Sequence, residues 1–311
     1  MEKKLISIIV PVYNNANSLE ELIHRVSSSF KNLKYTYEII FIDDGSIDNS
    51  LETLKIFSSR DKFIKIISLS KNFGQHSAIR AGFNHADGNL IILMDADLQD
   101  RPENIPLLIK KIISEELDVV FTMEKRGGKA GSLVTSRLYH FIFSKLTKTY
   151  VPPNVGTFRI FNRKFLSAIL QFNETKVLYG PLMFYVGFNA SYLELTRDIR
   201  LYGKSAYNFS KRFRLALDSL ISFTDFPHKV STIFGFAIFL SSLIYGLLII
   251  FQYAFFGRSL PPGYTLILLG LCILLGSIMM TLGVLGLYVY KVYQEVLSRP
   301  PYLIKEKVNL P

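Results

Sequence analysis

Short apolar runs rich in β-branched residues alternate with amphipathic segments over the first 120 residues of the chain. Helical spacing of apolar residues predicts helices at Asp48–Arg60, Gly74–Ala86 and Glu103–Glu115, between these runs. Strands that alternate with helices of this length favour right-handed crossovers, so the pattern predicts an α/β fold with a mostly parallel sheet and helices on both faces. The predicted strands are residues 5–13, 37–46, 64–70, 89–97 and 117–123.

Polar residues gather where these predicted strands end. The carboxyl ends of parallel strands meet along one edge of a sheet, and such sheets bind ligands there. We therefore expect a ligand site at this edge. The residues that the pattern places there are Pro11, Asp43, Asp44, Asn72, Asp95 and Asp97.

Two later runs, residues 230–257 and 259–290, contain no charged residue. Each exceeds the roughly 20 apolar residues that cross a bilayer, so they predict two transmembrane helices rather than a pair of buried core helices. Basic residues precede the first run and follow the second, whereas the connection carries only Arg258. The positive-inside rule therefore predicts a multi-pass protein with both termini in the cytoplasm. The flanking basic residues are Lys211, Arg212, Arg214, His228, Lys229, Lys291, Arg299, Lys305 and Lys307.

Between the predicted sheet and these runs, the chain becomes more basic and more helical in pattern. Residues 131–150 mix aromatic and cationic side chains at helical spacing, which suits either the membrane interface or packing against the sheet. Residues 207–227 have the same character and lead into the first apolar run, which favours amphipathic juxtamembrane helices. The pattern divides the chain into a cytoplasmic α/β domain (1–205), an amphipathic juxtamembrane segment (206–228), a two-helix transmembrane hairpin (229–291) and a cytoplasmic tail (292–311).

The net charge of +11 is consistent with the lipid bilayer as a partner. The basic residues around the apolar runs suit anionic lipid head groups. Nucleic acid is not an expected partner, because no recognition motif accompanies the charge. The single cysteine, Cys272, lies inside the second run and can form no internal disulfide, as in a reducing cytoplasmic domain.

The stretch DADLQD, residues 95–100, follows a predicted buried strand and contains three acids. Asp95 and Asp97 can direct oxygens toward one divalent cation, and hard oxygen ligands suit Mg²⁺ or Mn²⁺, which in turn bind diphosphate oxygens. The alternative without a bound metal is a solvated acidic turn. Asp100 is placed to cap the helix entered through Pro102 and Glu103.

The stretch DDGS, residues 43–46, places two further acids on a strand-to-loop turn. One of these carboxylates could accept hydrogen bonds from a base N–H or from a ribose hydroxyl. An Asx-type turn that caps the helix starting near Asp48 is an equally good interpretation of the residues alone.

Four motifs in order, SIIVPVYNN, IDDGSIDNS, NFGQHSAIRAGFNHADG and DADLQD, resemble those of glycosyltransferase family 2. The resemblance implies the GT-A fold, whose sheet is Rossmann-like. With the two apolar runs and the ending VYQEVLSRPPYLI, the chain is similar to bacterial polyprenyl-phosphate glycosyltransferases. These include undecaprenyl-phosphate glucosyl and formamido-arabinosyl transferases, and dolichol-phosphate mannose synthases are a related group.

The resemblance also implies roles for individual residues. Pro11, Val12, Tyr13, Asp43, Asp44 and Asp95 would bind the nucleotide-sugar, with Asp44 accepting from the uracil N–H, Asp43 supporting the turn and Asp95 near the ribose. Asp97 and Gln99 match metal ligands, with Asp95 beside them. Asp97, Arg159 and Arg200 would be catalytic, the arginines near the phosphates. Ser136, Arg137, Lys204 and Ser205 would lie at the lipid-phosphate acceptor.

Two departures from the family pattern concern the acceptor. Many relatives carry an acid, proposed as a base, where this chain has Thr157. Close relatives read S-K-Y where this chain has Ser205-Ala206-Tyr207, although Lys204 precedes the serine. A phosphate monoester has a second pKa of about 6 and is largely ionised at neutral pH. A phosphate acceptor therefore needs no general base, so a threonine is consistent with one.

These observations together predict an inverting, metal-dependent glycosyltransferase that moves one sugar from a UDP-sugar to undecaprenyl or another polyprenyl phosphate. The reaction would take place at the cytoplasmic face of the inner membrane, for modification of cell-envelope glycans such as lipopolysaccharide. A processive polysaccharide synthase is the enzymatic alternative, but its Q-x-x-R-W motif requires a tryptophan and the chain has none. A non-catalytic membrane scaffold of the same fold is the other alternative. The sugar is not predicted, and a homo-oligomer remains open.

Overall fold

The computed structural model describes residues 4–124, 152, 155–172, 174, 177–198 and 263–310, with scattered positions between 233 and 255. Contacts divide the chain into two units. The first comprises Met1–Arg212 together with Pro300–Pro311, and the second comprises Phe213–Arg299. Each unit is considered by itself.

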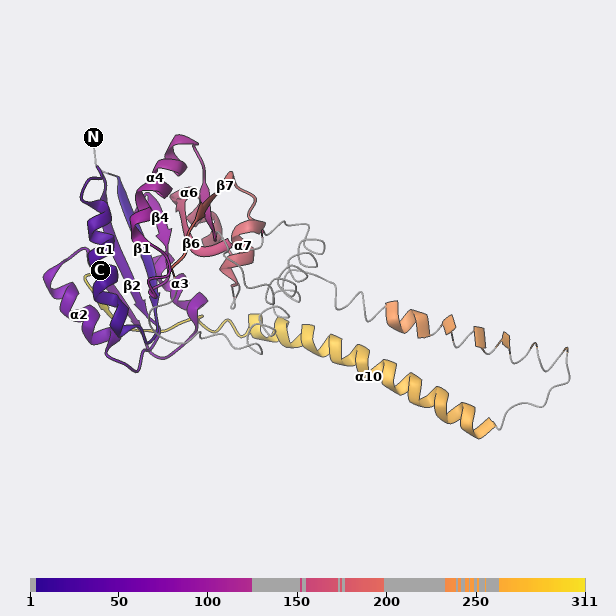
Figure 1. The fold of residues 1–311 in the computed structure, drawn as a ribbon. Coiled ribbons are helices and arrows are strands. Elements are labelled where there is room, and N and C mark those ends of the chain that lie inside the picture. Colours follow the sequence, from indigo (N-terminus) through magenta and orange to yellow (C-terminus); the bar gives the residue numbers. More distant parts are fainter. Residues whose placement is uncertain are drawn as a thin grey trace. The chain divides into compact units, whose positions relative to one another are not determined.

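The first unit contains an eight-stranded sheet in the order β7-β5-β6-β4-β1-β2-β3-β8 (Figure 1). Strands β4, β1, β2 and β3 pair in parallel, and β5 pairs in parallel with β7. β6 is antiparallel to both β4 and β5, and β8 is antiparallel to β3. The strands are β1 (Leu5–Val12), β2 (Thr36–Asp43), β3 (Ile64–Leu69), β4 (Leu90–Leu93), β5 (Val119–Glu124), β6 (Val155–Asn162), β7 (Ala190–Leu195) and β8 (Ile304–Val308).

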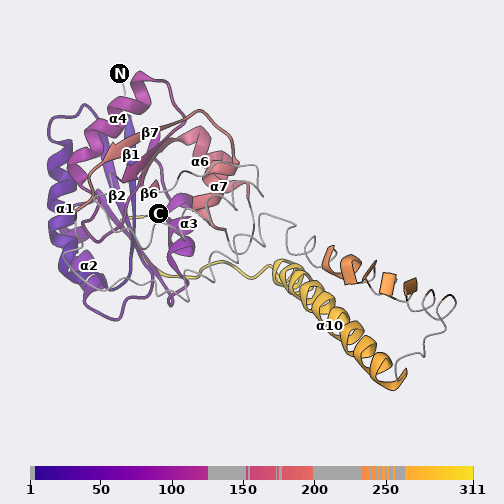
Figure 2. The ribbon, with the colours of Figure 1, turned by 45° about the vertical axis from the view of Figure 1, so that its right-hand side comes forward.

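Helices cover both faces of this sheet. Figure 2 shows α1 (Ala16–Phe30) and α2 (Ser50–Arg60) on one side, and α3 (Gln75–Asn84), α6 (Arg163–Leu170) and α7 (Tyr179–Tyr185) on the other. A 3₁₀ turn, Pro102–Asn104, leads into α4 (Ile105–Ser114), whose apolar residues join the core beneath α1. Strands covered on both faces must be apolar at successive positions, which explains the unbroken apolar runs in the sequence.

Neighbouring residues of β1 show how the two layers pack. Ile8 belongs to the core shared with α1 and α4. Ile9 points to the opposite face, where a Cβ added to Gly82 of α3 would lie 2.5 Å from its Cγ2. A side chain at position 82 would therefore push α3 away from the sheet. Both Ile8 and Ile9 are fully buried.

The expected α/β fold with a mostly parallel sheet is confirmed, but the sequence pattern missed three strands. β6 and β7 lie in the stretch that we expected to be more helical. The second correction concerns residues 292–311, which we expected to form a tail. Residues Ile304–Val308 are instead an edge strand whose burial alternates along the sequence IKEKV, and the charges on its outward face disguised it.

The second unit contains α10 (Gly263–Val296), a helix of 34 residues. Its segment Ile273–Val296 is the single stretch within the described part of the chain that is long and apolar enough to cross a membrane. The second predicted transmembrane helix therefore has a counterpart in the structure. The first, over residues 230–257, falls mostly outside the described residues, as does the juxtamembrane segment 206–228.

Candidate functional site

The predicted ligand edge forms where β1, β2 and β4 end together. The amide of Asp44 donates to the carbonyl of Val12 at 2.8 Å, and the amide of Met94 donates to the carbonyl of Ile9 at 3.1 Å. These bonds hold the acidic residues that follow β2 and β4 on either side of the end of β1. Residues from three separate parts of the chain thus meet at one edge.

The loops after β1 and β2 are tied to each other. Asn14, at φ 54°, donates its amide to the Ser46 hydroxyl at 3.0 Å, and its side chain accepts from the Ile47 amide at 2.9 Å. Val12 is buried beneath this junction, whereas Tyr13 is 43% exposed. The loop therefore presents an aromatic ring at the surface beside Pro11. Such a ring can stack on a planar base.

The two acids after β2 have different surroundings. Asp43 lies inside the turn, where it accepts from the Ser46 amide at 3.1 Å and from the Ser68 hydroxyl at 3.2 Å. Asp44 accepts from the amides of Phe73 and Gly74 at 2.7 and 2.9 Å, one to each carboxylate oxygen. Burial raises the pKa of Asp44 to about 6, although these two amides oppose the shift. Asp43 therefore forms a turn with Ser46, as the Asx-turn interpretation expects. Neither acid caps α2, however, so the capping part of that interpretation is wrong.

Gly45 permits this arrangement. Its φ is +67°, and a Cβ there would lie 2.6 Å from the carbonyl carbon of Lys71 and 2.7 Å from the amide nitrogen of Asn72. The turn after β2 and the loop 71–74 after β3 are therefore in direct backbone contact. Only glycine fits both the conformation and the approach.

Asp95 is held by side chains from three other elements. Its Oδ1 accepts from Gln75 Nε2 at 2.9 Å, and its Oδ2 lies 3.4 Å from Arg197 Nη2. The hydroxyl of Thr157 also donates to this carboxylate, and it opposes the rise in the pKa of Asp95 that burial and the neighbouring Asp97 cause. Thr157 thus lies against the acidic loop.

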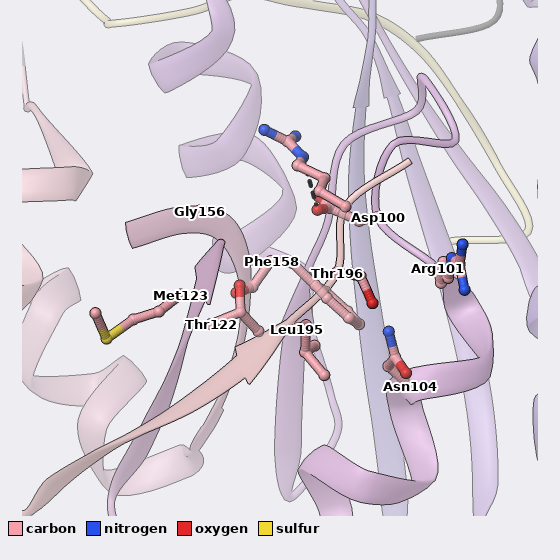
Figure 3. Close-up of a pocket in the computed structure, with 10 residues that line it drawn as sticks. Asp100, Arg101, Asn104, Thr122, Met123, Gly156, Phe158, Leu195 and Thr196 are labelled. Atoms are coloured by element: carbon pink, nitrogen blue, oxygen red, sulfur yellow. Dashed lines mark hydrogen bonds and ion pairs between the residues drawn. The ribbon is translucent and has the colours of Figure 1, made fainter. Parts of the chain in front are cut away.

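The acidic loop itself is a tight turn. Leu98 adopts a φ of 60°, which is uncommon for a residue with a side chain, and Asp97 accepts from the Gln99 amide at 3.2 Å. Asp97 is 6% exposed. Asp100 does not cap the following helix as expected. Its carboxylate instead lies 3.1 Å from Arg197 Nε, a pair that Figure 3 marks with a dashed line.

The electrostatics of this loop favour a cation. Asp95, Asp97 and Asp100 are accompanied by two guanidinium groups, those of Arg197 and Arg159. Burial raises the pKa of Asp100 to about 7, and the repulsion of Asp95 and Asp97 adds to this against the attraction of Arg197. One carboxylate thus remains in excess of the positive charge, so added positive charge would stabilise the ionised loop.

The donor set suits a metal with few protein ligands. Among the described residues, no three His, Cys, Asp or Glu side chains converge in a metal-binding arrangement. Mg²⁺ and Mn²⁺ fit such a site, because they take oxygen ligands and Mg²⁺ commonly uses one or two carboxylates with water and substrate phosphates. The residues that could hold the ion are therefore Asp97 with Gln99 and Asp95.

Arg159 lies behind the acidic loop on β6 and is 6% exposed. It donates to the carbonyls of Thr157 and Gly156 at 2.9 and 2.7 Å, and its guanidinium carbon lies 5.4 Å from the centre of the Phe121 ring. Burial lowers the pKa of Arg159 to about 10, which leaves it charged at neutral pH. Its donors hold the strand that carries Thr157.

A small pocket borders the acidic loop on the side of β5, β6 and β7 (Figure 3). Asp100, Arg101 and Arg197 contribute its charged groups, and Thr122, Phe158 and Leu195 are among the residues that line the rest. Of the described residues, neither Asp95 nor Asp97 lines it. The pocket therefore adjoins the acidic edge without containing it.

Five predicted site residues fall outside the described residues, namely Ser136, Arg137, Arg200, Lys204 and Ser205. Conversely, the structure places in the site four groups that were not predicted from the sequence, namely Gln75, Arg197 and the amides of Phe73 and Gly74. Gln75 and the two amides lie in the motif NFGQH, so that motif was the available signal. Arg197 reaches Asp95 and Asp100 by a pairing between distant parts of the chain, which no local pattern signals.

The sequence is similar to those of known glycosyltransferases. Residues 7–170 match the family described as Glycosyl transferase family 2. An uncharacterized glycosyltransferase of Synechocystis, sll0501, is 37% identical over 97% of this chain and 95% of its own. An undecaprenyl-phosphate 4-deoxy-4-formamido-L-arabinose transferase of Proteus mirabilis is 33% identical over 98% and 94%. A prophage-derived bactoprenol glucosyl transferase of Shigella flexneri is 32% identical over 97% of both chains.

A solved structure shares the fold at lower sequence identity. The glucosyl-3-phosphoglycerate synthase of Mycobacterium tuberculosis, crystallised with Mn²⁺, UDP and glucosyl-3-phosphoglycerate, superposes with a TM-score of 0.51. It is 18% identical, and the match covers 71% of this chain and 80% of the synthase. This likeness identifies the sheet domain as a GT-A-like fold.

Proposed function

The chain belongs to glycosyl transferase family 2, and we propose that it transfers a single sugar from a UDP-sugar to a polyprenyl phosphate. The observation that carries the proposal is the excess of buried carboxylate at the sheet edge, set beside the Asp44 turn. A site for a metal-bound diphosphate next to a base-binding turn is what a nucleotide-sugar requires. The two named relatives supply the class of acceptor.

The nucleoside would bind between the loops after β1 and β2. Tyr13 would stack on the uracil beside Pro11 and Val12, and Asp44 would accept from the uracil N–H. Each oxygen of Asp44 already accepts one amide, but a carboxylate oxygen has a second lone pair for this purpose. Asp43 keeps the turn in place from behind.

The diphosphate would lie over the acidic loop, with Asp95 toward the ribose. Asp97 and Gln99, with Asp95, would hold Mg²⁺ or Mn²⁺, which supplies positive charge against the charge that develops on the departing UDP. The fold relative crystallised with Mn²⁺ and UDP supports this assignment. Asp97 lies in a strained, buried turn, which would orient its carboxylate before the donor arrives.

The acceptor phosphate would attack without a general base. Its oxygen forms the new bond to the anomeric carbon as the bond to UDP breaks, and the configuration at that carbon inverts. At neutral pH the phosphate monoester is largely dianionic, so no proton must be removed. Thr157 serves here by donating to Asp95 rather than by accepting a proton.

Cationic residues would bring the two anions together. Arg159 contributes a fixed positive charge behind Asp95, and its bonds to Gly156 and Thr157 orient the strand that faces the donor. We propose Arg200, Lys204, Ser205, Ser136 and Arg137 as the group that receives the lipid phosphate. Ser136 and Arg137 lie within the first basic amphipathic segment and the other three precede the second, and such segments suit an anionic membrane surface.

The proposed location is the cytoplasmic face of the inner membrane, with α10 as one of two spans and both termini in the cytoplasm. The product would be a lipid-linked sugar for envelope glycan modification such as that of lipopolysaccharide. Glucose-like and aminoarabinose-like sugars both fit the relatives.

A coupled assay of UDP release tests this function. The full-length protein in detergent is incubated with a UDP-sugar and Mn²⁺ or Mg²⁺, with and without undecaprenyl phosphate. We expect UDP release only when both the metal and the lipid phosphate are present. If every donor that binds gives the same UDP release with and without undecaprenyl phosphate, the proposed acceptor is contradicted.

A further inference from the structure

The chain returns to the sheet domain after α10 (Figure 1). Strand β8 pairs with β3 in antiparallel register from Ile66–Val308 to Leu69–Ile304, with an irregularity between Ser68 and Leu69. Beyond the ladder, the amide of Ser70 donates to the carbonyl of Leu303 at 2.9 Å. The C-terminal segment, residues 302–309, therefore follows β3 up to the loop that faces Asp44.

The same segment also contacts the far end of the helix that follows this loop. Asn84, the last residue of α3, donates its side-chain amide to the Tyr302 hydroxyl at 2.8 Å. Leu303 and Tyr302 thus hold Ser70 and Asn84, the two ends of one continuous stretch. Residues 70–84 are anchored at both ends by two adjacent residues from the C-terminus.

The stretch between these anchors carries groups that organise the site. The amides of Phe73 and Gly74 bind Asp44, and Gln75 binds Asp95. Gly74 has a φ of +95°, and a Cβ added to it would meet nothing within 4 Å. The Cβ direction of Gly74 is therefore open, and the loop backbone here is held by Asp44, by the contact of Lys71 and Asn72 with Gly45, and by its two ends.

The other end of the C-terminal segment holds the strand itself. Asn309 donates to the carbonyls of Ser58 and Ile64 at 2.8 and 2.9 Å. Lys55 and Glu306 form an ion pair at 2.6 Å. The Asn309 contacts lie toward the amino end of β3, opposite the edge where the acids gather, whereas Glu306 pairs with Ser68 nearer the carboxyl end. They stabilise β8 without touching residues 70–84.

We propose that Tyr302 and Leu303 are positioning residues for the donor nucleotide, acting through residues 70–84. Fixing a loop before a ligand binds reduces the entropy that is lost on binding, and so it raises affinity. The C-terminal segment follows α10 directly in the chain, so it also links the membrane helix to the nucleotide loop. This inference rests on the proposed function, in which Asp44 and Asp95 bind the UDP moiety.

The test compares Tyr302→Phe with Asn309→Ala in the full-length protein. Tyr302→Phe removes only the acceptor for Asn84, whereas Asn309→Ala removes two hydrogen bonds at the opposite end of the same segment. Titration calorimetry gives the Kd for UDP with Mn²⁺, and steady-state assays give KM and kcat for the donor. We expect Tyr302→Phe to weaken UDP binding about three- to tenfold and to raise KM by a similar factor, with kcat within twofold.

Asn309→Ala should lower the melting temperature yet leave the Kd for UDP within twofold of the wild type. Equal Kd values for Tyr302→Phe and the wild type overturn the inference. Equal weakening by both variants also overturns it, because the effect is then one of general stability. Absence of UDP binding by the wild type contradicts the proposed function instead, so the two failures are distinguishable.

Discussion

Arg197 Nε lies 3.1 Å from a carboxylate oxygen of Asp100, and this ion pair joins the end of β7 to the acidic loop that follows β4. Asp100 is 6% exposed, and its other oxygen is buried with no hydrogen-bond partner in the described part of the chain. Arg197 also lies near Asp95. One cation thus opposes the rise in pKa that burial causes in two carboxylates of the loop.

Loss of this cation should destabilise the fold. Arg197→Met leaves buried acids without compensation, and we expect the free energy of unfolding to fall by about 3 kcal/mol. Thermal unfolding can be followed by tyrosine fluorescence, since the chain contains 17 Tyr and no Trp. Arg101→Met is the matched control, because Arg101 is more exposed and pairs with the surface residue Asp198. That change should lower the melting temperature much less, because exposed ion pairs contribute little to stability. Equal losses in the two variants contradict the account of Arg197.

Stability should fall as pH rises through the acid range. The pKa of Asp100 is about 7 in the folded chain, against about 3.9 when unfolded. Between these values the folded state holds a proton that the unfolded state has released, so the free energy of unfolding decreases with pH, by up to about 1.4 kcal/mol per unit. Asp44, with a pKa of about 6, contributes in the same direction.

Melting temperatures of the ligand-free protein from pH 4.5 to 7.5 check this sign. Asp100→Asn should make the decline in melting temperature with pH less steep, because about one fewer proton is released on unfolding. Asp198→Asn serves as the control, because its partner Arg101 lowers the pKa of Asp198 and its removal cannot flatten the decline. A melting temperature that rises steadily over this range contradicts the argument.

Asp97→Asn should abolish most of the activity. We expect kcat/KM to fall at least about 100-fold, because the variant loses a charged ligand for the metal that stabilises departing UDP. UDP binding should also lose its enhancement by Mn²⁺. Asp87→Asn is the control, since Asp87 is an exposed acid at the opposite end of the strands, where it lies 3.4 Å from Lys65. Retained metal dependence in Asp97→Asn would exclude Asp97 as a ligand.

Thr157→Val should leave most of the activity in place. The hydroxyl supplies one hydrogen bond to Asp95, so its loss should reduce kcat/KM by about tenfold or less. The acidic limb of the pH–rate profile should stay near pH 6 in both proteins, because it reflects ionisation of the lipid phosphate. A loss of activity far beyond tenfold in Thr157→Val contradicts this account of the position.

The proposed hairpin can be tested with the single cysteine of the chain. Arg258→Cys in a Cys272→Ser background places one thiol in the connection between the two apolar runs. Positive-inside orientation puts this thiol outside, so a membrane-impermeant maleimide should label it in intact cells. If the thiol is labelled only in permeabilised cells, the predicted orientation is wrong and the connection lies in the cytoplasm.

The parts of this fold that could be predicted from sequence are those with a local signal. β1 to β5 are visible because strands covered on both faces are apolar throughout, as Ile8 and Ile9 illustrate. β7 and β8 alternate over only a few residues and owe their place to partners far away in the chain. The same holds for the site. Asp44 and Asp97 lie in recognisable motifs, whereas Arg197 enters through tertiary pairing.

The most direct measurement of the central claim is mass spectrometry of the lipid after reaction. The full-length protein is incubated with undecaprenyl phosphate, Mn²⁺ or Mg²⁺, and each of a panel of UDP-sugars, with Asp97→Asn run alongside. We expect one donor to increase the lipid mass by a single sugar residue, with no product from Asp97→Asn. An unmodified lipid with every UDP-sugar that the protein binds, or a lipid bearing a chain of sugars, would contradict single-sugar transfer to a polyprenyl phosphate.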